Sequence, residues 1–390
     1  MQHRTIHGPA QKARDNLAPE RVVRRAVSAE GLKANFPPIE LPIQPPFQVM
    51  EARSAETLPP GNHVQFEPKW DGFRCLVFRA GANVALQSKS GQPLGRYFPE
   101  LVAFFTKLPR THFVLDGEIV ILRDGQLFFD DLLLRIHPAE SRIRRLARDS
   151  PATYIVFDLL VDDKSMAQIA GGASLVELPL CERRARLQRF FSALPSSKTM
   201  LLSPSTSNRR TAEHWLLELT GSGFDGIVAK DQDMPYTSGQ RTGMIKIKRM
   251  RTADCVVGGF RWASKGGRVG SLLLGLYDRQ AKLNHVGFTS SFTTTERKEL
   301  AGIFEPYRDG TGFTGSAPGG PSRWSTERTG EWEKLKPKLV CEVRYDHFSG
   351  GRFRHGTKFL RWRPDKDPRQ CTYDQLQKIG APLSKLGLAA

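Results

Sequence analysis

The sequence contains few cysteines, few acidic residues and no long apolar run. No stretch reaches the ~18–20 apolar residues that a membrane span needs, and the N-terminus lacks the apolar core of a secretory signal. The five cysteines are scattered and form no C-x-x-C pair, which argues against a zinc ribbon or a disulfide framework. We therefore expect a protein of a reducing compartment, the cytoplasm, with no membrane association.

Acidic residues are outnumbered, 40 against 58 Lys and Arg, and the net charge is +18 at pH 7. Residues 252–390 carry +9 of this charge, which is half of the total. With 39% hydrophobic residues the chain can still bury a core, and its length suggests two or three domains. A basic folded surface favours a polyanionic partner, most often nucleic acid, although a generally basic proteome is the alternative.

The chain divides by composition into four predicted segments. Residues 1–44 read as a basic N-terminal extension and linker, with a short helix around Glu20–Ala26 and five prolines between Phe36 and Phe47. Residues 45–250 are predicted to form a catalytic domain and residues 251–376 a second domain. Residues 377–390 are predicted to be a C-terminal tail.

Short β-like runs and helical stretches interleave after Val64 without a regular strand–helix–strand repeat. The predicted strands are Val64–Pro68, Cys75–Arg79, Val84–Ser88, Phe113–Leu115, Glu118–Leu122, Tyr154–Asp158, Gly226–Lys230 and Met244–Lys248. The predicted helices are Pro99–Leu108, Ser141–Arg148, Cys181–Leu194 and Thr211–Gly221. This pattern predicts an α+β domain with antiparallel sheets.

The pattern after Arg251 is almost entirely β. The predicted elements are strands at Ala253–Arg261, Ser271–Asp278, Leu283–Thr289, Leu339–Asp346 and Lys358–Arg363, a helix at Thr295–Phe304 and a long loop at Asp309–Glu331. Five strands and one helix match an OB-fold, a barrel that often binds nucleic acid. Arg249–Ala253 is predicted to be a hinge.

The strongest chemical signal is the stretch Glu67-Pro68-Lys69-Trp70-Asp71-Gly72-Phe73-Arg74. A strand leads into Lys69, and Asp71-Gly72 then predicts a turn. A free lysine, with a pKa of about 10.4, is a poor nucleophile at neutral pH, so a reactive lysine needs burial, a cationic neighbour or a metal. The alternative is a β-hairpin that carries ordinary surface charges.

This stretch resembles motif I of the covalent nucleotidyltransferases, which include DNA ligases, RNA ligases and mRNA capping enzymes. Five further motifs of that superfamily follow in the same order. They are Asp116-Gly117-Glu118, Phe157-Asp158, Asp225-Gly226-Ile227-Val228-Ala229-Lys230, Lys246-Ile247-Lys248 and Arg363-Pro364-Asp365-Lys366. Six ordered motifs form a specific match, although each one alone would be weak.

The resemblance implies that Lys69 becomes covalently adenylylated and that ATP binds around it. Glu67 would recognise adenine, Phe157 would stack on the ring, and Glu118 would bind the ribose. Arg74 would contact the nucleotide sugar and the DNA nick. A core phenylalanine is the alternative interpretation of Phe157.

Metal and phosphate contacts are implied in the same way. Asp225, with Glu118, would bind Mg²⁺ or Mn²⁺, although the family more often has Glu at position 225. Lys246 and Lys248 alternate on a strand and would reach the α-phosphate together, although a basic solvent face is the alternative. Lys89 occupies a position where arginine is expected, and would contact the nick phosphate.

Arg363 and Lys366 lie in the second domain and would swing over the active site to orient the ATP pyrophosphate, which is the reason for a hinge. Residues 1–35 have no counterpart in the minimal family, and we interpret them as an extra contact to DNA phosphates. Deleting these residues should then flatten the salt dependence of DNA binding.

The likeness narrows to bacterial ATP-dependent DNA ligases of the ligase C type, which also resemble the ligase module of ligase D. It runs from about Pro45 to Leu376 and includes Arg96–Leu101, Arg135–Arg142, Gly270–Tyr277 and Phe359–Pro368. It implies ATP as donor, nicked duplex DNA as partner, a role in DNA repair beside other repair factors, a nucleoid location and a monomer. No four-cysteine zinc site of the NAD-dependent ligases is visible.

Two alternatives remain at this point. An RNA ligase or a capping guanylyltransferase shares the same chemistry, and a preference for nicked RNA or for GTP would identify it. A non-catalytic nucleic-acid-binding protein with the same fold would bind nicked DNA but would never be labelled by ATP.

Overall fold

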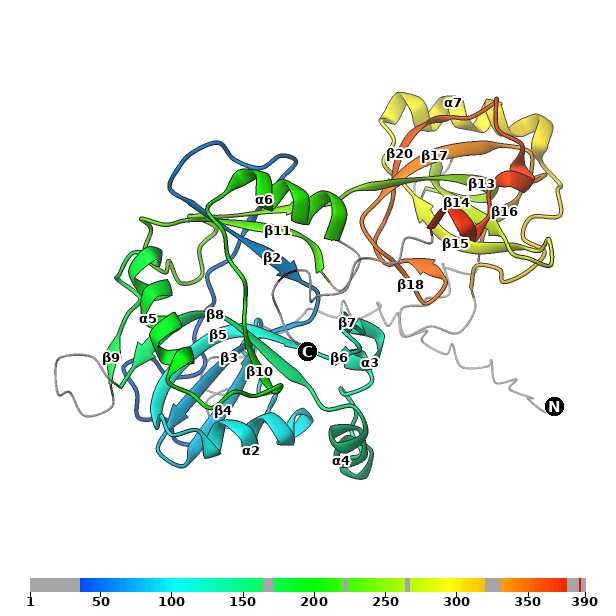
Figure 1. Cartoon of the computed structure of the whole chain (residues 1–390). Coiled ribbons are helices and arrows are strands. Elements are labelled where there is room, and N and C mark those ends of the chain that lie inside the picture. The colour runs from blue at the N-terminus through cyan, green and yellow to red at the C-terminus, as the bar shows by residue number, and fades with distance from the viewer. Residues whose placement is uncertain are drawn as a thin grey trace, which may run out of the picture.

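The computed structural model describes residues 36–163, 172–219, 224–263, 267–319, 331–376 and Leu386. These residues form two units, a two-sheet unit (residues 36–248) and a barrel unit (residues 251–376), shown in blue to green and in yellow to red in Figure 1. The helix predicted around Glu20–Ala26 and nearly all of the predicted tail lie outside the described residues. Within the described ranges, no helix has the length and apolar character needed to cross a membrane.

The larger sheet of the two-sheet unit has six strands. Their order is β10 (Met200–Leu202), β8 (Thr153–Asp162), β5 (His112–Val120), β3 (Phe73–Ala80) and β4 (Asn83–Ser88), with β9 (Ala173–Ser174) paired to β8. All pairings are antiparallel except β10 with β8. The two strands predicted at Phe113–Leu115 and Glu118–Leu122 are instead one strand, β5. It continues through Gly117, where a Cβ atom would lie 2.5 Å from the ring of Tyr154.

Both faces of this sheet are covered, because successive side chains of a strand point to opposite sides. Cys75 and Val77 of β3 belong to the core beneath α2 (Pro99–Lys107) and α5 (Leu180–Ser192). Leu76 and Phe78 belong to the opposite core, together with Ile39, Leu41 and Ile43. The proline-rich segment predicted as a linker is therefore packed into the two-sheet unit from Ile39 onwards.

The second sheet has four strands in the order β1 (Arg53–Ala55), β12 (Met244–Lys248), β11 (Phe224–Asp231) and β2 (Val64–Trp70). The chain passes from this sheet to the larger one at Asp71-Gly72, between β2 and β3. A Cβ atom at Gly72 would lie 2.3 Å from the carbonyl oxygen of Ile119, so only glycine fits this crossing. β2 and β3 belong to different sheets, so the β-hairpin alternative for this stretch is wrong.

Smaller elements connect the sheets, and several were not predicted. They are η1 (Gly95–Tyr97), β6 (Leu122–Arg123), β7 (Gln126–Leu127), α3 (Phe129–Leu133), α4 (Glu140–Asp149), α6 (Arg209–His214) and the π-helical turn η2 (Trp215–Leu219). β1, β10 and α3 were missed because they are short and depend on pairing or packing with distant segments.

The barrel unit is an OB-fold, as predicted. Its antiparallel strands run in the order β15 (Leu283–Thr289), β14 (Val269–Tyr277), β13 (Arg251–Trp262), β17 (Val340–Tyr345) and β20 (Lys358–Trp362). A parallel bridge between Thr289 and Thr357, the residue before β20, brings the two ends of this order together. Helix α7 (Thr294–Phe304) lies between β15 and β17 in sequence and begins with a Thr293/Glu296 capping box.

Three short strands complete the barrel unit: β16 (Glu333–Lys334), β18 (Phe348–Ser349) and β19 (Arg352–Phe353). β18 and β19 pair as a small hairpin between β17 and β20. Two 3-10 turns follow β20, η4 (Pro368–Gln370) and η5 (Tyr373–Leu376).

The connection between the units is shorter than the hinge predicted at Arg249–Ala253. β12 ends at Lys248 and β13 begins at Arg251. Thr252 and Ala253 already pair with β17, since their register partners are Arg344 and Val343. Only Arg249 and Met250 therefore link the two units.

Candidate active site

A cavity between the two sheets gathers most of the residues predicted from the sequence. Its lining includes Glu67, Lys69, Arg74, Lys89, Glu118, Phe157 and Lys246. These side chains come from both sheets, and the crossing at Asp71-Gly72 lets motif I contribute to both walls, with Lys69 on β2 and Arg74 on β3.

Lys69 is held by a carboxylate from the neighbouring strand. Its Nζ donates to Asp225 Oδ1 at 2.7 Å, and Lys248 Nζ lies 3.3 Å from the other oxygen, Oδ2. The geometry results from a β-bulge, because Lys69 on β2 faces two residues of β11, Asp225 and Gly226. A Cβ atom at Gly226 would lie 2.0 Å from the carbonyl oxygen of Ile247, so the bulge requires glycine.

Lys246 and Lys248 extend this cluster of positive charge along β12. Lys246 lines the cavity with Lys69 and Lys89, and Lys248 reaches Asp225. Burial and the charges of Lys69, Lys89 and Lys248 lower the pKa of Lys246 below its usual value. Lys69, Lys89 and Lys248 lie close enough for their charges to act on Lys246, and this concentration of ammonium groups suits a polyphosphate.

Glu67 is fixed deep in the cavity wall. It is 2% exposed, accepts a hydrogen bond from Gln65 Nε2 at 2.7 Å and pairs with Lys230 Nζ at 2.9 Å. The Lys230 ammonium lies 4.5 Å from the centroid of the Phe157 ring. Sequence reasoning did not single out Lys230, although a lysine in an apolar strand needs a buried partner and could have drawn attention to it.

Arg74 reaches the cavity through a buried network. Its Nε and Nη2 donate to the two oxygens of Asp116 at 3.1 and 2.7 Å, and the Tyr236 hydroxyl donates to Asp116 Oδ2 at 2.7 Å. The Arg74 guanidinium also lies 5.4 Å from the Phe157 ring centroid. Asp116 and Tyr236 were missed because nothing in their local sequence reveals this contact across the chain.

Glu118 lines the cavity opposite the lysines. Burial raises the pKa of its carboxyl to about 8, against the opposing charges of Lys69 and Arg74. At neutral pH a protonated Glu118 can both donate and accept a hydrogen bond, which fits a sugar hydroxyl.

Lys89 stands at the rim of the cavity, after β4. Its side chain is 54% exposed and its Nζ lies 3.2 Å from Glu51 Oε2. An exposed, flexible lysine can contact a phosphate from many orientations, whereas arginine makes two hydrogen bonds in a fixed geometry.

Arg363 and Lys366 do not join the cavity. Arg363 Nη1 lies 2.9 Å from Asp254 Oδ1 and its Nη2 lies 2.8 Å from Asp365 Oδ2, and Lys366 Nζ lies 3.7 Å from Asp254 Oδ2. Both cations are thus paired with carboxylates of their own barrel. The predicted approach to the nucleotide requires the barrel to move.

Family comparisons agree with the arrangement of the two units. The family described as "ATP dependent DNA ligase domain" matches residues 49–248, and "ATP dependent DNA ligase C terminal region" matches residues 265–366. The chain belongs to the ATP-dependent DNA ligase family. DNA ligase C1 of Mycolicibacterium smegmatis is 41% identical over 348 residues, which cover 87% of this chain and 96% of that protein.

Two further ligases are similar to this chain, one in sequence and one in fold. DNA ligase C of Mycobacterium tuberculosis is 41% identical over 356 residues, with 87% and 96% of the two chains covered. A solved Lig E DNA ligase shares the fold, with a TM-score of 0.51 and 18% identity over 81% of this chain and 99% of that one. The resemblance to the ligase C type is therefore confirmed.

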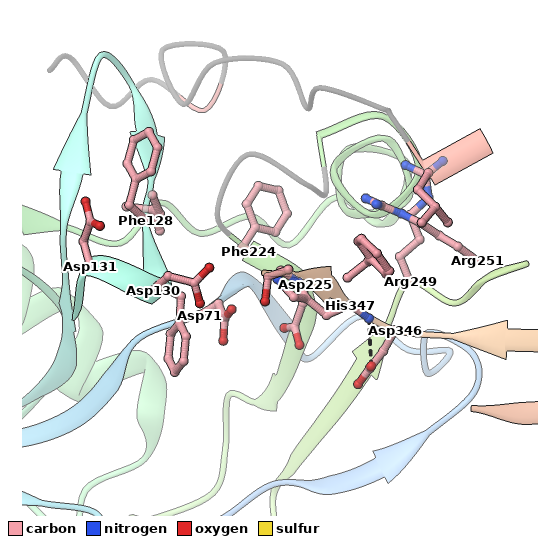
Figure 2. A pocket seen from close by; sticks show the side chains of 15 residues that line it. Asp71, Phe128, Asp130, Asp131, Phe224, Asp225, Arg249, Arg251, Asp346 and His347 are labelled. Carbon is pink, nitrogen blue, oxygen red and sulfur yellow. Dashed lines mark hydrogen bonds between the residues drawn. The ribbon is translucent and has the colours of Figure 1, made fainter. Parts of the chain in front are cut away.

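A second pocket of this ligase-family chain lies between the two units, next to Lys69. Figure 2 shows Asp71 and Asp225 of the two-sheet unit and Asp346 and His347 of the barrel around it. Two ion pairs cross between the units here. Arg354 Nη1 lies 2.5 Å from Asp71 Oδ2, and Lys248 Nζ lies 2.6 Å from Asp346 Oδ2. Asp346 and Arg354 were missed because their contacts depend on how the barrel docks.

Proposed function

We propose that this protein is an ATP-dependent DNA ligase that seals nicks between a 5′-phosphate and a 3′-hydroxyl in duplex DNA. The reaction runs through AMP bound covalently to Lys69. The observation that carries this proposal is the position of Lys69 in the wall of the cavity, hydrogen-bonded to Asp225 at 2.7 Å, with Lys246 and Lys248 nearby. Membership of the ATP-dependent DNA ligase family supports the same activity.

In the first step, the Lys69 amine attacks the α-phosphorus of ATP. An N–P bond forms while the bond to pyrophosphate breaks, and the proton of Lys69 has a carboxylate acceptor in Asp225. Lys246 and Lys248 are placed to stabilise the negative charge that grows on the α-phosphate oxygens. Phe157 and Glu67 would hold the adenine, and Glu118 the ribose.

A divalent cation, Mg²⁺ or Mn²⁺, fits one position in this arrangement. Asp225 is the carboxylate beside Lys69, and Mg²⁺ is usually held by one or two carboxylates together with substrate phosphates. The described part of the chain contains no cluster of three or more His, Cys, Asp or Glu that could hold a metal alone, which suits a cation that binds with ATP. When bound, the cation would neutralise phosphate charge and favour the neutral lysine.

In the second step, the 5′-phosphate at the nick attacks the lysyl-AMP phosphorus and releases Lys69. In the third step, the 3′-hydroxyl attacks the 5′-phosphorus and AMP leaves. Lys89 at the cavity rim is suited to hold the nick phosphate, and the +9 charge of residues 252–390 suits the DNA backbone. Arg363 and Lys366 would have to leave Asp254 to act on pyrophosphate in the first step.

We assign the activity to DNA repair in the bacterial cytoplasm, with a monomer acting on nicks left by other repair enzymes. Support comes from the "Multifunctional non-homologous end joining DNA repair protein LigD" of Mycobacterium tuberculosis, which is 31% identical over 314 residues. These residues cover 78% of this chain but only 37% of that protein, so the likeness concerns one part of it.

A gel assay of nick sealing tests the proposal directly. The substrate is a duplex with one nick and a labelled 5′-phosphate, incubated with Mg²⁺ or Mn²⁺ and either ATP, NAD or GTP. We expect joining with ATP only, and none when the nick lacks its 5′-phosphate. Joining that is confined to an RNA nick would instead support an RNA ligase, and binding without joining would support a non-catalytic protein.

A further inference from the structure

The β18–β19 hairpin of the barrel lies between two residues that reach across to the two-sheet unit. Arg354, just after β19, pairs with Asp71 at 2.5 Å. Its guanidinium also lies 3.5 Å from the centroid of the Phe129 ring, within the range of a cation–π contact. Asp71 is two residues from Lys69, so this end of the hairpin docks at the nucleophile.

Asp346, which lies just before β18, makes the second contact with the two-sheet unit. Its Oδ2 lies 2.6 Å from Lys248 Nζ, and His355 Nδ1 lies 3.0 Å from the same carboxylate oxygen. The Asp346 side chain is only 13% exposed. Burial alone raises the pKa of this carboxyl, but the hydrogen bond and charge of Lys248 reverse that effect and lower it to about 2. Asp346 is therefore an anion held against a lysine of the phosphate site.

A third pair between the units is weaker. Arg344 Nη2 lies 3.3 Å from Glu56 Oε1, but the Glu56 side chain is 82% exposed, so water and salt screen the pair. The two pairs that matter are the half-buried ones, and both end on residues next to Lys69 or in the lysine cluster. The two half-buried ion pairs between the units thus lie beside the active site, and Asp71 and Asp346, one partner of each pair, line the pocket in Figure 2.

We propose that the hairpin is an autoinhibitory latch, in which Asp346 occupies the phosphate-binding ammonium of Lys248 until the ATP phosphates displace it. The latch regulates the Lys69 site and therefore rests on the proposed function. A triphosphate carries several negative charges against the single charge of Asp346, so it competes effectively for Lys248.

Among the described residues, displacement of Asp346 leaves the Arg354–Asp71 pair and the exposed Arg344–Glu56 pair between the units. Partly exposed ion pairs are weak tethers, and only Arg249 and Met250 join the units covalently. ATP loading therefore loosens the barrel at the step in which Arg363 must leave Asp254.

The first test measures single-turnover lysyl-AMP formation from α-³²P-ATP over a range of ATP concentrations, without DNA, after bound AMP is stripped with pyrophosphate. Asp346→Asn keeps the shape and removes the competing charge, so the half-saturating ATP concentration should fall about three- to tenfold with little change in maximal rate. High salt should shrink the difference.

Two variants serve as matched controls. Arg352→Gln removes a positive charge from β19 that contacts His285 of the barrel, and Glu333→Gln removes a carboxylate that pairs with Arg308 within the barrel. Both should behave as wild type. A half-saturating concentration in Asp346→Asn equal to or above that of wild type would overturn the latch.

The second test follows the distance between the units by energy transfer, and it needs no chemistry. One dye is placed on Cys181, which is exposed, and the other on Lys298→Cys, an exposed position of α7. Unreactive α,β-methylene-ATP should lower the transfer in wild type. Asp346→Asn combined with Arg354→Gln should show the lower transfer before nucleotide is added.

The two tests separate the latch from the proposed function. Equal transfer in wild type and the double variant would rule out the latch even if Lys69 is adenylylated normally. A wild type that forms no lysyl-AMP would refute the proposed function, and the transfer measurement would still decide whether the hairpin holds the units together.

Discussion

The nucleotide cavity and the last motif of this ligase differ in how their charges are satisfied. In the cavity, Lys69 and Lys248 share Asp225, and Glu67 pairs with Lys230, all between strands of one unit. In the barrel, Arg363 pairs with Asp254 and Asp365 of its own unit. One half of the catalytic machinery is therefore assembled before ATP arrives, whereas the other half has to be brought to it.

The physical reason lies in what surrounds each group. The cavity is fixed between two sheets whose shared cores hold its walls in register. The barrel is joined to that unit by two residues and by exposed or half-buried ion pairs, which can exchange partners at low cost. Because the pocket is preassembled and the barrel can move, one enzyme can react first with ATP and then with DNA.

The largest expected effect comes from breaking the preassembled half. Lys246→Ala removes a cation from the cavity wall and should slow lysyl-AMP formation by about 10²–10³-fold, because charge on the α-phosphate loses a fixed partner. Lys338→Ala, at an exposed barrel position, is the matched control. Single-turnover labelling measures both, and equal rates would show that Lys246 does not reach the phosphate.

Arg363→Ala removes a cation from the barrel, the part of the machinery that has to move. It should slow the first chemical step without slowing the third. We expect lysyl-AMP formation to fall by about 100-fold, while a nick that already carries AMP on its 5′-phosphate is sealed at nearly the wild-type rate. Sealing of a pre-adenylylated nick, measured without ATP, is the second readout. A loss of that activity as large as the loss of labelling would mean that Arg363 is not confined to the first step.

Glu118 allows a smaller, pH-dependent test of the cavity. Its folded pKa of about 8 exceeds the ordinary value of 4.5, so between these values the folded state holds a proton that the unfolded chain has lost. The stability contributed by this group should therefore fall as the pH rises from 4.5 to 8. Glu118→Gln cannot titrate, so urea unfolding across that window should show a flatter profile than in wild type. Parallel profiles would contradict the raised pKa.

The smallest effect is expected at the rim. Lys89→Arg restores the residue expected from the family likeness and should tighten binding to nicked DNA by about two- to threefold, because arginine can make two bonds to a phosphate. Fluorescence anisotropy with a nicked duplex at fixed salt measures the change. Weaker binding would mean that Lys89 is positioned by Glu51 rather than by DNA.

Local sequence patterns predicted much of the fold. Alternating apolar residues indicated most long strands, and the six ordered motifs led to the cavity residues through family likeness. The single strand β5 was predicted as two strands because Gly117 interrupts the apolar run. In the structure the strand continues through Gly117, which packs against the ring of Tyr154. The hinge was predicted too long because the strand was expected to begin at Ala253, whereas β13 already begins at Arg251 and Thr252 pairs with Arg344 of β17.

Local sequence patterns did not predict the hydrogen-bond and ion-pair partners of the site residues. Asp116 holds Arg74 and Lys230 holds Glu67 through pairings between strands that are far apart in sequence. Asp346 and Arg354 depend on the docking of one unit against the other. A motif identifies a residue by type and order, but its hydrogen-bond partner is set by the register of the sheets.

The measurement that tests the central claim most directly is label transfer from α-³²P-ATP to the protein, with Lys69→Ala beside wild type. The protein is first stripped of bound AMP with pyrophosphate and is then incubated with Mg²⁺ or Mn²⁺. We predict label that stays with wild type through denaturing electrophoresis and is absent from Lys69→Ala. Unlabelled wild type, or equal label in Lys69→Ala, would contradict the assignment of Lys69 as the nucleophile.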